Sequence, residues 1–306
     1  MAELLVGRGY RVVGTTRPGV QPNYDRLGSI RESVQIVVGD LLDEGSLRKL
    51  IETHGPAEIY NFAARASSSQ LFRDPVLTSE LNGVAVVRLL EAIRQVDPAI
   101  RFCQASSSEM FGASLESPQS ERTAFCPRNP YGVAKLLAHG MVGTYRERHG
   151  LFACSSILFN HESPRRGAEF VTRKVTMGAA RIKAGLADSL QLGSLEATRD
   201  WGYAQDYVRG MWQMLQCPAS DDYVLATGES HSVRELCAIA FAHVGLDYQK
   251  HVVLDPHAQR PPEAVKLVGD STKARRVLDW KPTVSFEQLV NMMVDADLER
   301  LSHERR

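Results

Sequence analysis

The sequence lacks an excess of charge of either sign and lacks a long apolar run. Lysine plus arginine and aspartate plus glutamate each number 36 among the 306 residues. Without a basic excess, the charge balance gives no support for a nucleic acid or a membrane surface as a partner. No run approaches the ~20 consecutive apolar residues that are needed to span a bilayer. The composition therefore excludes these classes of protein and predicts no such partner.

Cysteine is scarce and is not spaced as in disulfide-rich or zinc-binding proteins. The five cysteines are an odd number without close pairing, at positions 103, 126, 154, 217 and 237. This pattern argues against a disulfide framework and against a metal site. The first residues also carry no basic region, long apolar stretch or cleavage site of a secretory signal. Together these features predict a cytoplasmic protein without a bound metal.

The length and composition that remain are those of a globular protein with two domains. Apolar residues make up 43% of the chain and charged residues 24%. At about 150 residues per domain, the length predicts two domains. We place the first domain at 1–165, partly interleaved with a smaller lobe at 166–306.

Short apolar runs alternate with amphipathic segments over the first two thirds of the chain. The predicted strands are 11–16, 34–38, 58–63, 100–105 and 152–158, and the predicted helices are 46–53, 76–96 and 130–147. This alternation is typical of βα units around a parallel sheet. A further amphipathic helix is predicted over 285–304. We therefore expect an α/β protein with a doubly wound, mostly parallel Rossmann-like sheet and a smaller α/β lobe at the C-terminal end.

One expected feature of a dinucleotide-binding sheet is missing from this sequence. Such a sheet opens with a strand, a glycine-rich turn and a helix whose N-terminus receives the pyrophosphate. Gly7-Arg8-Gly9 has the glycine spacing, but it follows helix-type residues and precedes a strand. It is therefore predicted to be a helix end, and the first strand and its turn are absent. Either the true start of the protein lies upstream, which we favour, or the chain is a defective relative.

A phenol and an ammonium group lie four residues apart at Tyr131 and Lys135. On a helix, side chains at this spacing share one face. A free phenol titrates near 10, and a neighbouring ammonium favours its ionised form. Such a pair could take a proton from a substrate hydroxyl. The alternative interpretation is an ordinary surface pair.

Three serines and a glutamate follow the predicted strand that ends at residue 105. Groups just past the carboxyl end of a strand in an open parallel sheet face the ligand crevice. A serine run is often only a turn or a helix cap, but beside a Tyr–Lys helix its hydroxyl could orient a reacting alcohol. Glu109 could remove a second proton, from carbon, which an ordinary alcohol dehydrogenase would not need.

These residues resemble those of a known family of enzymes. Ser107-Ser108-Glu109 with Tyr131-x-x-x-Lys135 resembles the extended short-chain dehydrogenase/reductase superfamily, in its sugar-nucleotide dehydratase branch. Several further segments are similar to the GDP-mannose 4,6-dehydratase family, namely 157–167, 170–174, 199–202, 226–228, 233–235 and 280–282. The resemblance runs from Met1 almost to the C-terminus.

The resemblance implies an NADP-dependent hydro-lyase that converts GDP-mannose to GDP-4-keto-6-deoxymannose. The family oxidises carbon 4, eliminates water across carbons 5 and 6, and returns the hydride to carbon 6. By resemblance, Tyr131 takes the proton from the hydroxyl on carbon 4, and Ser107, where the family usually has threonine, hydrogen-bonds that oxygen. Glu109 removes the proton from carbon 5 and returns it to the departing hydroxyl. Lys135 binds the nicotinamide ribose and keeps Tyr131 acidic.

The choice of cofactor also has an argument from the residues. An acidic residue after the second strand of such a sheet would bind the ribose of NAD, whereas an arginine accommodates the phosphate of NADP. Here the strand is followed by Arg17, with no acid until Asp25, so NADP is favoured. The resemblance implies further cofactor contacts at Asp40, Leu41, Phe62, Ala63, Ala64, His161 and Arg166, in addition to Lys135.

The resemblance also implies the substrate contacts. Guanidinium groups match a diphosphate well, and Arg199 and Arg260 correspond to the diphosphate-binding arginines of the family. Asn160 and Lys174 correspond to further nucleotide contacts, and Glu263 is a candidate for the ribose hydroxyls. Arg165 and Glu162 are expected to form structural ion pairs.

Some positions depart from the family and limit what carries over. Arg65 and Leu71 stand where the family has polar cofactor and substrate contacts, so the role of this loop is open. The segment 16–20 replaces the loop through which the bacterial enzymes form tetramers, so a tetramer is not expected. A homodimer through the helices 76–96 and 130–147 is expected, as in the superfamily.

Two other functions stay open at this point. A related NADP-dependent GDP-hexose reductase or epimerase would use the serine, the tyrosine and the lysine, but would not need a carboxylate at Glu109. A catalytically silent protein that binds GDP-sugar would fit the missing glycine-rich turn. That absence also predicts weak NADP binding and little turnover by this chain.

Overall fold

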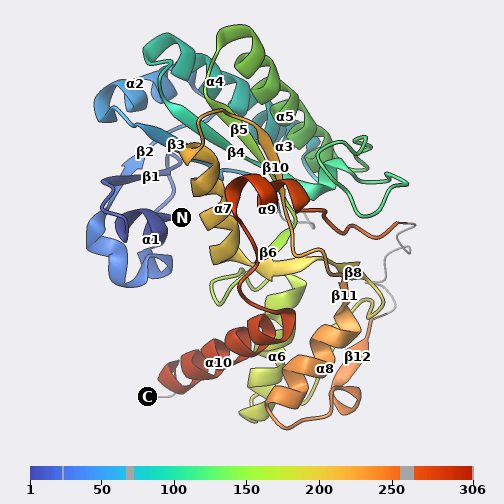
Figure 1. The fold of residues 1–306 in the computed structure, drawn as a ribbon. Helices are drawn as coiled ribbons and strands as arrows, with labels where there is room; N and C mark the ends of the chain where they lie inside the picture. Colours follow the sequence, from blue (N-terminus) through green and yellow to red (C-terminus); the bar gives the residue numbers. More distant parts are fainter. Residues whose placement is uncertain (23, 67–71, 256–264, 305–306) are drawn as a thin grey trace.

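The computed structural model describes residues 1–22, 24–66, 72–255 and 265–304. The chain forms two parts with a narrower waist between them (Figure 1). The upper part contains most of the parallel strands and the N-terminus, and the lower part contains the helix that ends near the C-terminus.

A four-stranded parallel sheet forms the centre of the upper part. Its order is β10 (Asp222–Leu225), β5 (Ala153–Leu158), β4 (Arg101–Ser107) and β3 (Glu58–Asn61). The two central strands, β4 and β5, are buried along nearly their whole length. Continuous burial is what parallel strands with both faces covered show, and it explains why these segments read as unbroken runs of small and apolar residues.

A second parallel ladder joins β1 (Val12–Thr16) to β2 (Val34–Val38), with five residue pairs in register. Among the described residues this ladder is separate from the four-stranded sheet. The amino ends of β1 and β3 nevertheless lie together, because the Tyr10 hydroxyl donates to Glu58 Oε1 at 3.2 Å. The carboxyl ends of both ladders therefore lie on the same side of the molecule.

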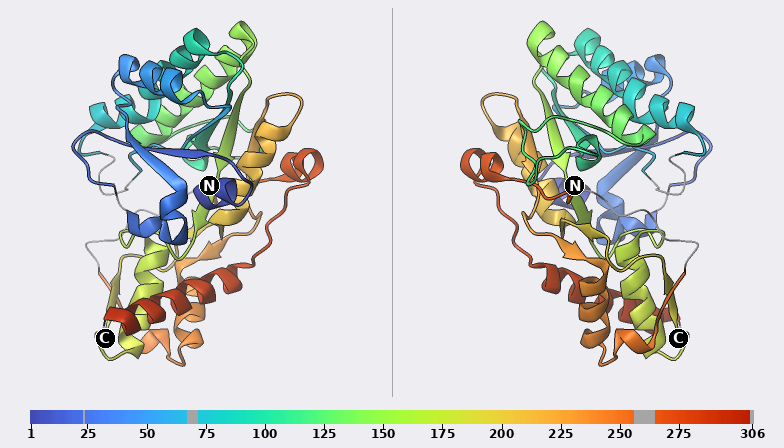
Figure 2. Two further views of the ribbon diagram at one scale, coloured as in Figure 1. Left: turned by 90° about the vertical axis from the view of Figure 1, so that its left-hand side faces the viewer. Right: turned by 90° about the vertical axis from the view of Figure 1, so that its right-hand side faces the viewer.

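Helices cover both faces of these strands (Figures 1 and 2). One face carries α2 (Glu44–His54), α4 (Ala85–Val96) and α5 (Pro130–His149), which pack against one another. The other face carries α7 (Ala204–Gln216), which packs on β4 and β5, and α9 (Thr272–Leu278), which packs on β10. The result is a three-layered α/β arrangement.

Local sequence signals account for where these helices begin and end. In α4 the buried residues Val86, Leu89, Leu90 and Ile93 recur at helical spacing, so that one stripe faces the core. In α5 the side chain of Asn129 caps the first turn, Pro130 occupies the first helical position, and Gly150 ends the helix in the left-handed region with φ 66°.

The lower part is built from three helices and short strand pairs. The helices α6 (Val171–Lys183), α8 (Val233–His243) and α10 (Phe286–Glu304) pack around one apolar core. The strand pairs are β7 (Leu190–Leu192) with β12 (Val252–Leu254), β8 (Thr198–Arg199) with β11 (His231–Ser232), and β6 (Asn160–Glu162) with β9 (Trp201–Tyr203). Both β6 and β9 lie near the waist (Figure 1).

The predicted α/β fold is confirmed, and most predicted elements differ from the structure only at their ends. One predicted helix differs from the structure in its interior. The predicted helix 76–96 begins as α3 (Pro75–Ser79) and passes through one π-helical segment (Glu80–Val84) before it becomes α4. The buried side chain of Asn82 lies in this segment and hydrogen-bonds the backbone of Arg65. A side chain that bonds a neighbouring loop accounts for the local change of helix type.

The N-terminal glycines behave as a helix end, as predicted. The helix α1 (Ala2–Val6) stops before Gly7, Gly9 has φ 80°, and β1 follows. The division at residue 165 stays a prediction. Within the range 166–306, the elements α7, β10 and α9 lie on the upper sheet.

Two further features of the described residues concern partners. None of the described helices combines the length and the apolar character required to cross a bilayer. Among the same residues, no group of three or more histidine, cysteine, aspartate or glutamate side chains is arranged to hold a metal ion.

Candidate active site

The carboxyl end of β4 presents the serine and the glutamate that the sequence singles out. The strand ends at Ser107, and a single 3₁₀ turn, η4 (Ser108–Met110), follows. Ser107 is buried, and its Oγ accepts a hydrogen bond from the backbone N–H of Glu109 at 3.2 Å. The serine thus caps the turn that carries Glu109, as one of the two interpretations of this run predicted.

The first turn of α5 packs directly against this turn. A Cβ on Gly132 would lie 2.6 Å from the carbonyl oxygen of Glu109. Only glycine allows the two backbones to approach so closely. Because Tyr131 precedes Gly132, this contact places the phenol beside η4.

Tyr131 lies within reach of both Ser107 and Glu109. Burial raises the pKa of Tyr131 to about 12, and the negative charge of Glu109 acts in the same direction. A hydrogen bond with the Ser107 side chain and the positive charge of Arg166 act in the opposite direction. The four side chains therefore act on one another at a single place, and burial is the largest effect.

Lys135 is buried one turn farther along α5, with 2% of its surface exposed. Its Nζ donates to the carbonyl oxygen of Ala105 at 2.8 Å and lies 5.6 Å from the centre of the Tyr131 ring. Burial lowers the pKa of this ammonium to about 8. The expectation that Lys135 keeps Tyr131 acidic stays a prediction; among the effects on the pKa of this phenol, burial is the largest.

Asn129 was not predicted as a site residue, yet it contacts Glu109. Its Nδ2 donates to Glu109 Oε2 at 2.8 Å, and its Oδ1 accepts from the backbone N–H of Gly132 at 2.8 Å. An asparagine before a proline does indicate a helix N-cap. The contact with Glu109 spans 20 residues, and no local pattern could have revealed it.

His161 and Arg166 lie on the same side of the sheet, after the end of β5. His161 Nδ1 lies 2.9 Å from the carbonyl oxygen of Phe159, so this nitrogen donates. Burial lowers the pKa of His161 to about 4, which keeps the ring neutral at pH 7. The positive charge of Arg166 acts on both His161 and Tyr131, which places the guanidinium near both.

Arg166 is itself held by its neighbours. Its Nε lies 3.1 Å from Glu162 Oε2, and its guanidinium lies over the Phe170 ring, 3.5 Å from the ring centre. Arg165 instead pairs with Glu3 at 2.6 Å. Glu162 and Arg165 thus each form an ion pair, with different partners.

The remaining predicted cofactor residues follow the ends of the first three parallel strands. Arg17 follows β1 and is exposed. Asp40 follows β2, where its Oδ1 accepts from the N–H of Leu42 at 2.9 Å. The segment of Phe62, Ala63 and Ala64 follows β3 and is exposed. Leu41 is partly buried against the core beneath α2 and α4.

The predicted substrate residues lie in or near the waist and the lower part. Asn160 begins β6 and pairs in register with Trp201 of β9. Arg199 ends β8, two residues before that partner, and its Nη1 donates to the carbonyl oxygen of Thr198 at 2.7 Å. Lys174 is exposed on the first turn of α6. Arg260, Glu263 and Leu71 lie outside the described residues.

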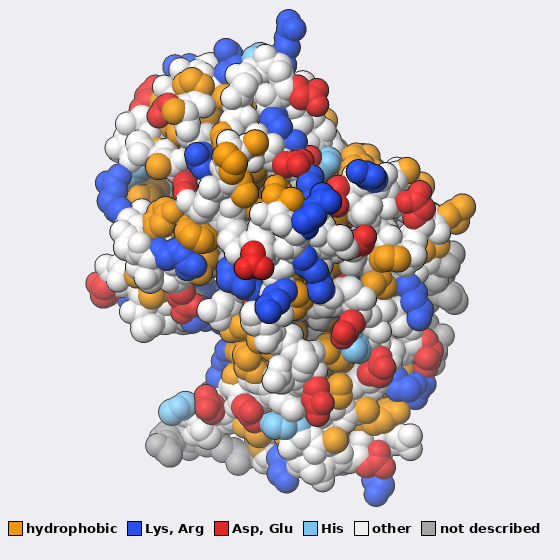
Figure 3. Space-filling model, viewed as in Figure 1, with side chains coloured by type: hydrophobic (Ala, Val, Ile, Leu, Met, Phe, Trp, Pro, Cys, Tyr) orange, Lys and Arg blue, Asp and Glu red, His pale blue; other side chains and the backbone are white. Residues whose placement is uncertain are grey.

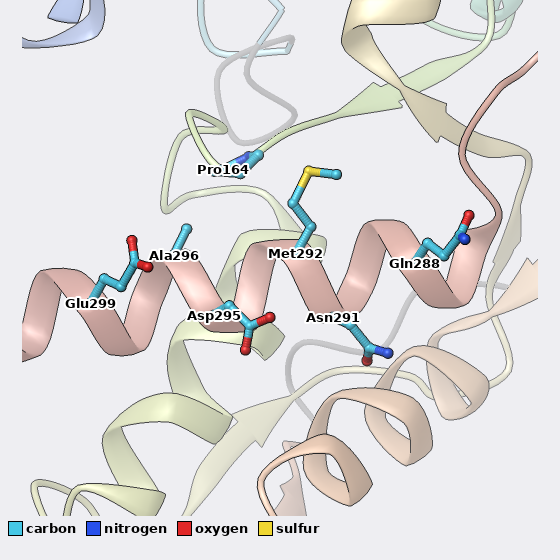
Figure 4. A pocket seen from close by; sticks show the side chains of 7 residues that line it. All are labelled: Pro164, Gln288, Asn291, Met292, Asp295, Ala296 and Glu299. Atoms are coloured by element: carbon cyan, nitrogen blue, oxygen red, sulfur yellow. The ribbon is translucent and has the colours of Figure 1, made fainter.

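A groove of about 530 Å³ elsewhere on the surface is not part of this site (Figure 4). It runs along α10, where Met292, Asp295 and Glu299 line it together with Pro164. None of the predicted site residues lines this groove. On the face of the molecule seen in Figure 3, side chains of both charge signs are present.

The burial of Lys135 generates a prediction that needs no ligand. With lysine labelled at the carbon next to the ammonium, an NMR titration should show one lysine that loses its charge near pH 8. Burial disfavours the charged form, so Lys135 is still charged at pH 7 and becomes neutral as the pH rises through 8.

That titration should disappear in Lys135→Met and persist in Lys183→Met, a variant of a lysine exposed on α6. If no lysine of the wild-type chain titrates near pH 8, the ammonium is solvated and the described packing of α5 on β4 is wrong.

Comparison with known proteins places the chain in a family. The sequence profile of the family described as "GDP-mannose 4,6 dehydratase" matches residues 1–293. GDP-mannose 4,6 dehydratase 1 of Arabidopsis thaliana is 46% identical, over 100% of this chain and 88% of that protein. The human GDP-mannose 4,6 dehydratase is 42% identical, over 98% of this chain and 88% of that protein.

A solved structure supports the fold. The structure of RMD from Pseudomonas aeruginosa complexed with NADPH has a TM-score of 0.82 at 23% identity, and the match covers 95% of this chain and 100% of that chain. The full-length sequence matches confirm the resemblance that the motifs around Ser107, Tyr131 and Asn160 indicate. The chain belongs to the GDP-mannose 4,6-dehydratase family.

Proposed function

We propose that this chain dehydrates GDP-mannose to GDP-4-keto-6-deoxymannose. The observation that carries the proposal is the meeting of Glu109, Ser107 and Tyr131 where β4 ends and α5 begins. A carboxylate beside a Ser–Tyr–Lys group supplies a second acid–base group, which an oxidation of one alcohol would not require. The family and the names of its members support this substrate.

The residues divide the proton transfers among them. Tyr131 takes the proton of the hydroxyl on carbon 4, and Ser107 holds that oxygen by a hydrogen bond. The ketone at carbon 4 acidifies the hydrogen on carbon 5, and Glu109 removes it as a proton. The carbon–oxygen bond at carbon 6 then breaks, and the proton on Glu109 joins the departing hydroxyl to form water. When hydride is returned to carbon 6, carbon 5 takes up a proton, which balances the proton that Tyr131 removed from the hydroxyl on carbon 4.

The chemistry of the donors fits a nicotinamide cofactor. Among the described residues, Lys135 has one carbonyl acceptor and no carboxylate partner, so its remaining donors suit a ligand rich in hydroxyls. When bound, the oxidised nicotinamide would bring a positive charge and an acceptor for the hydride of carbon 4, which it would return at carbon 6. That positive charge would favour the ionised form of Tyr131 and oppose the effect of burial.

Most of the proposed cofactor contacts lie just after the carboxyl ends of strands. Lys135 would bind the nicotinamide ribose, His161 and Arg166 would lie beside the phenol, and Asp40 with Leu41 would face the adenine. The exposed backbone of 62–64 would pass along the cofactor. Arg17, exposed after β1, would bind the additional phosphate of NADP.

We assign the GDP end of the substrate to the predicted substrate-binding residues. Arg199 and Arg260 would bind the diphosphate by paired hydrogen bonds from their guanidinium groups. Asn160 and Lys174 would contact the nucleotide, and Glu263 the ribose hydroxyls. The position of Asn160 beside β9, close in sequence to Arg199, supports a shared binding surface at the waist.

The cysteines support a cytoplasmic location. Cys103 of β4 and Cys154 of β5 are neighbours in register, and both are buried and free. Buried thiols without a disulfide fit a reducing compartment. We therefore place the enzyme in the cytoplasm.

The role of Glu109 can be tested with a single-turnover reaction at saturating NADP. In Glu109→Gln the carboxylate base is lost, so 4-keto-6-deoxy product should fall by about 100-fold or more. Binding of GDP-mannose, measured by calorimetry, should stay within about twofold, because the change is isosteric and far from the diphosphate contacts.

The matched control is Glu116→Gln, which changes an exposed carboxylate on the loop after η4. It should leave product formation unchanged. Full dehydration by Glu109→Gln would contradict the assignment of the base, and absence of product from the wild-type chain at saturating NADP would favour the silent binding protein.

The preference for NADP can be tested by fluorescence titration of both cofactors. The wild-type chain should bind NADP more tightly than NAD, because Arg17 can pair with the additional phosphate. Arg17→Glu should reverse this preference, because a carboxylate repels the additional phosphate and can bind a ribose hydroxyl. Arg181→Glu, an exposed change on α6, is the control. An equal preference of the wild-type chain for the two cofactors would contradict the expectation.

An exposed apolar surface supports the proposed homodimer. Val133 and Leu137 lie four residues apart on α5 and are 54% and 44% exposed, and Val76 on the adjacent α3 is 73% exposed. Side chains at this spacing share one helix face. We propose that a second copy covers this surface, with the helices 76–96 and 130–147 of both copies in contact.

Light scattering coupled to gel filtration should therefore report a dimer for the wild-type chain. The double change Val133→Glu with Leu137→Glu should give a monomer, because two charges per copy would be buried in the interface. Leu115→Glu, at a side chain that is 90% exposed on a separate loop, should stay dimeric. A monomeric wild-type chain would contradict the proposed interface.

A further inference from the structure

Asn129 has two polar ends, and the structure uses both of them. Its carbonyl oxygen accepts from the N–H of Gly132 and caps α5, while its amide nitrogen donates to Glu109 Oε2, each at 2.8 Å. No step of the proposed reaction uses Asn129. Its side chain nevertheless connects the helix that carries the phenol to the carboxylate that removes the proton from carbon 5.

The geometry leaves this amide little freedom. The amide group is planar, so a hydrogen bond at the carbonyl end fixes the direction of the nitrogen end. The carbonyl end is fixed by the helix, because Gly132 belongs to the first turn of α5. Backbone contact between Gly132 and Glu109 keeps η4 directly beside that turn.

The two oxygens of Glu109 therefore differ. Among the described residues, Oε2 accepts the hydrogen bond from Asn129, and no hydrogen bond or ion pair engages Oε1. A donor on one oxygen restricts rotation of the carboxylate and leaves the other oxygen available to a ligand. A proton transfer requires its base within hydrogen-bond distance in the correct direction.

We propose that Asn129 is a positioning residue that orients Glu109, so that Oε1 is the atom that takes the proton from carbon 5. This inference rests on the proposed dehydration. It assigns to one amide both the cap of α5 and the direction of the carboxylate. The positions of Tyr131 and Glu109 are thereby fixed relative to each other.

The variant Asn129→Asp separates the two functions of this side chain, the cap of α5 and the hydrogen bond to Glu109. Aspartate caps helices as well as asparagine does, so the melting temperature should change little. It has no N–H to donate to Glu109, and its charge repels the carboxylate. Asn129→Ala removes both functions and should also lower the melting temperature, as Asp43→Ala should at the corresponding cap of α2.

The first arm of the experiment is a single turnover at saturating NADP. Hydride leaves carbon 4 before Glu109 acts, so Asn129→Asp should accumulate the absorbance of reduced nicotinamide while the 4-keto-6-deoxy product forms about 100-fold more slowly. If Asn129 acts only through Glu109, the double variant Glu109→Gln with Asn129→Asp should be no slower than Glu109→Gln alone. Additive losses would overturn the proposal.

The second arm needs no turnover. The side-chain amide protons of Asn129, observed by NMR, should shift upfield in Glu109→Gln, because a hydrogen bond to a neutral amide is weaker than one to a carboxylate. They should not move in Glu116→Gln. Unchanged amide signals in Glu109→Gln would overturn the proposal. If the amide signals shift in Glu109→Gln but the wild-type chain forms no product, the contact between Asn129 and Glu109 stands and the proposed dehydration is refuted.

Discussion

The buried ammonium of Lys135 fixes the arrangement on which the whole site depends. An ammonium removed from water must find acceptors, and the carbonyl oxygen of Ala105 in β4 supplies one at 2.8 Å. This bond holds the second turn of α5 to the sheet, while the bare backbone of Gly132 holds its first turn to η4. With the helix fixed at both points, Tyr131 can only lie beside the end of β4. The catalytic group is therefore a consequence of how one helix is attached to one strand.

The surroundings of the Tyr131 phenol shift its pKa in opposite directions. Burial and the negative charge of Glu109 favour the protonated form of Tyr131, whereas Ser107 and Arg166 favour the ionised form. The first pair of effects is larger, so the pKa of Tyr131 is raised to about 12 and the phenol is protonated at pH 7. A ligand that adds positive charge would shift this balance toward the ionised phenol.

Strands and helices were predictable here because the core is built from periodic apolar runs. β4 and β5 are buried on both faces and read as continuous runs, and the buried stripe of α4 recurs at helical spacing. Ser107, Glu109 and Tyr131 were predictable because parallel strands expose their carboxyl ends on one side. The contact of Asn129 with Glu109 could not be predicted from the sequence, because it depends on how η4 packs against α5. The raised pKa of Tyr131 was missed for a similar reason, since spacing shows that Lys135 is near but not how deeply the phenol is buried.

The division of the parallel strands into two ladders separates the proposed catalytic residues from part of the proposed cofactor contacts. Ser107, Glu109 and Tyr131 depend on β4 and α5, whereas Arg17 and Asp40 depend on the ladder of β1 with β2. Among the described residues no strand pairing joins the two ladders; what connects them is the packing of α2 on α4 and the contact of Tyr10 with Glu58. A change in the relative position of the ladders would therefore weaken the cofactor contacts while leaving the catalytic side chains in place. The proposed cofactor contacts and the proposed catalytic residues can therefore vary independently in this architecture, because different hydrogen-bond ladders support them.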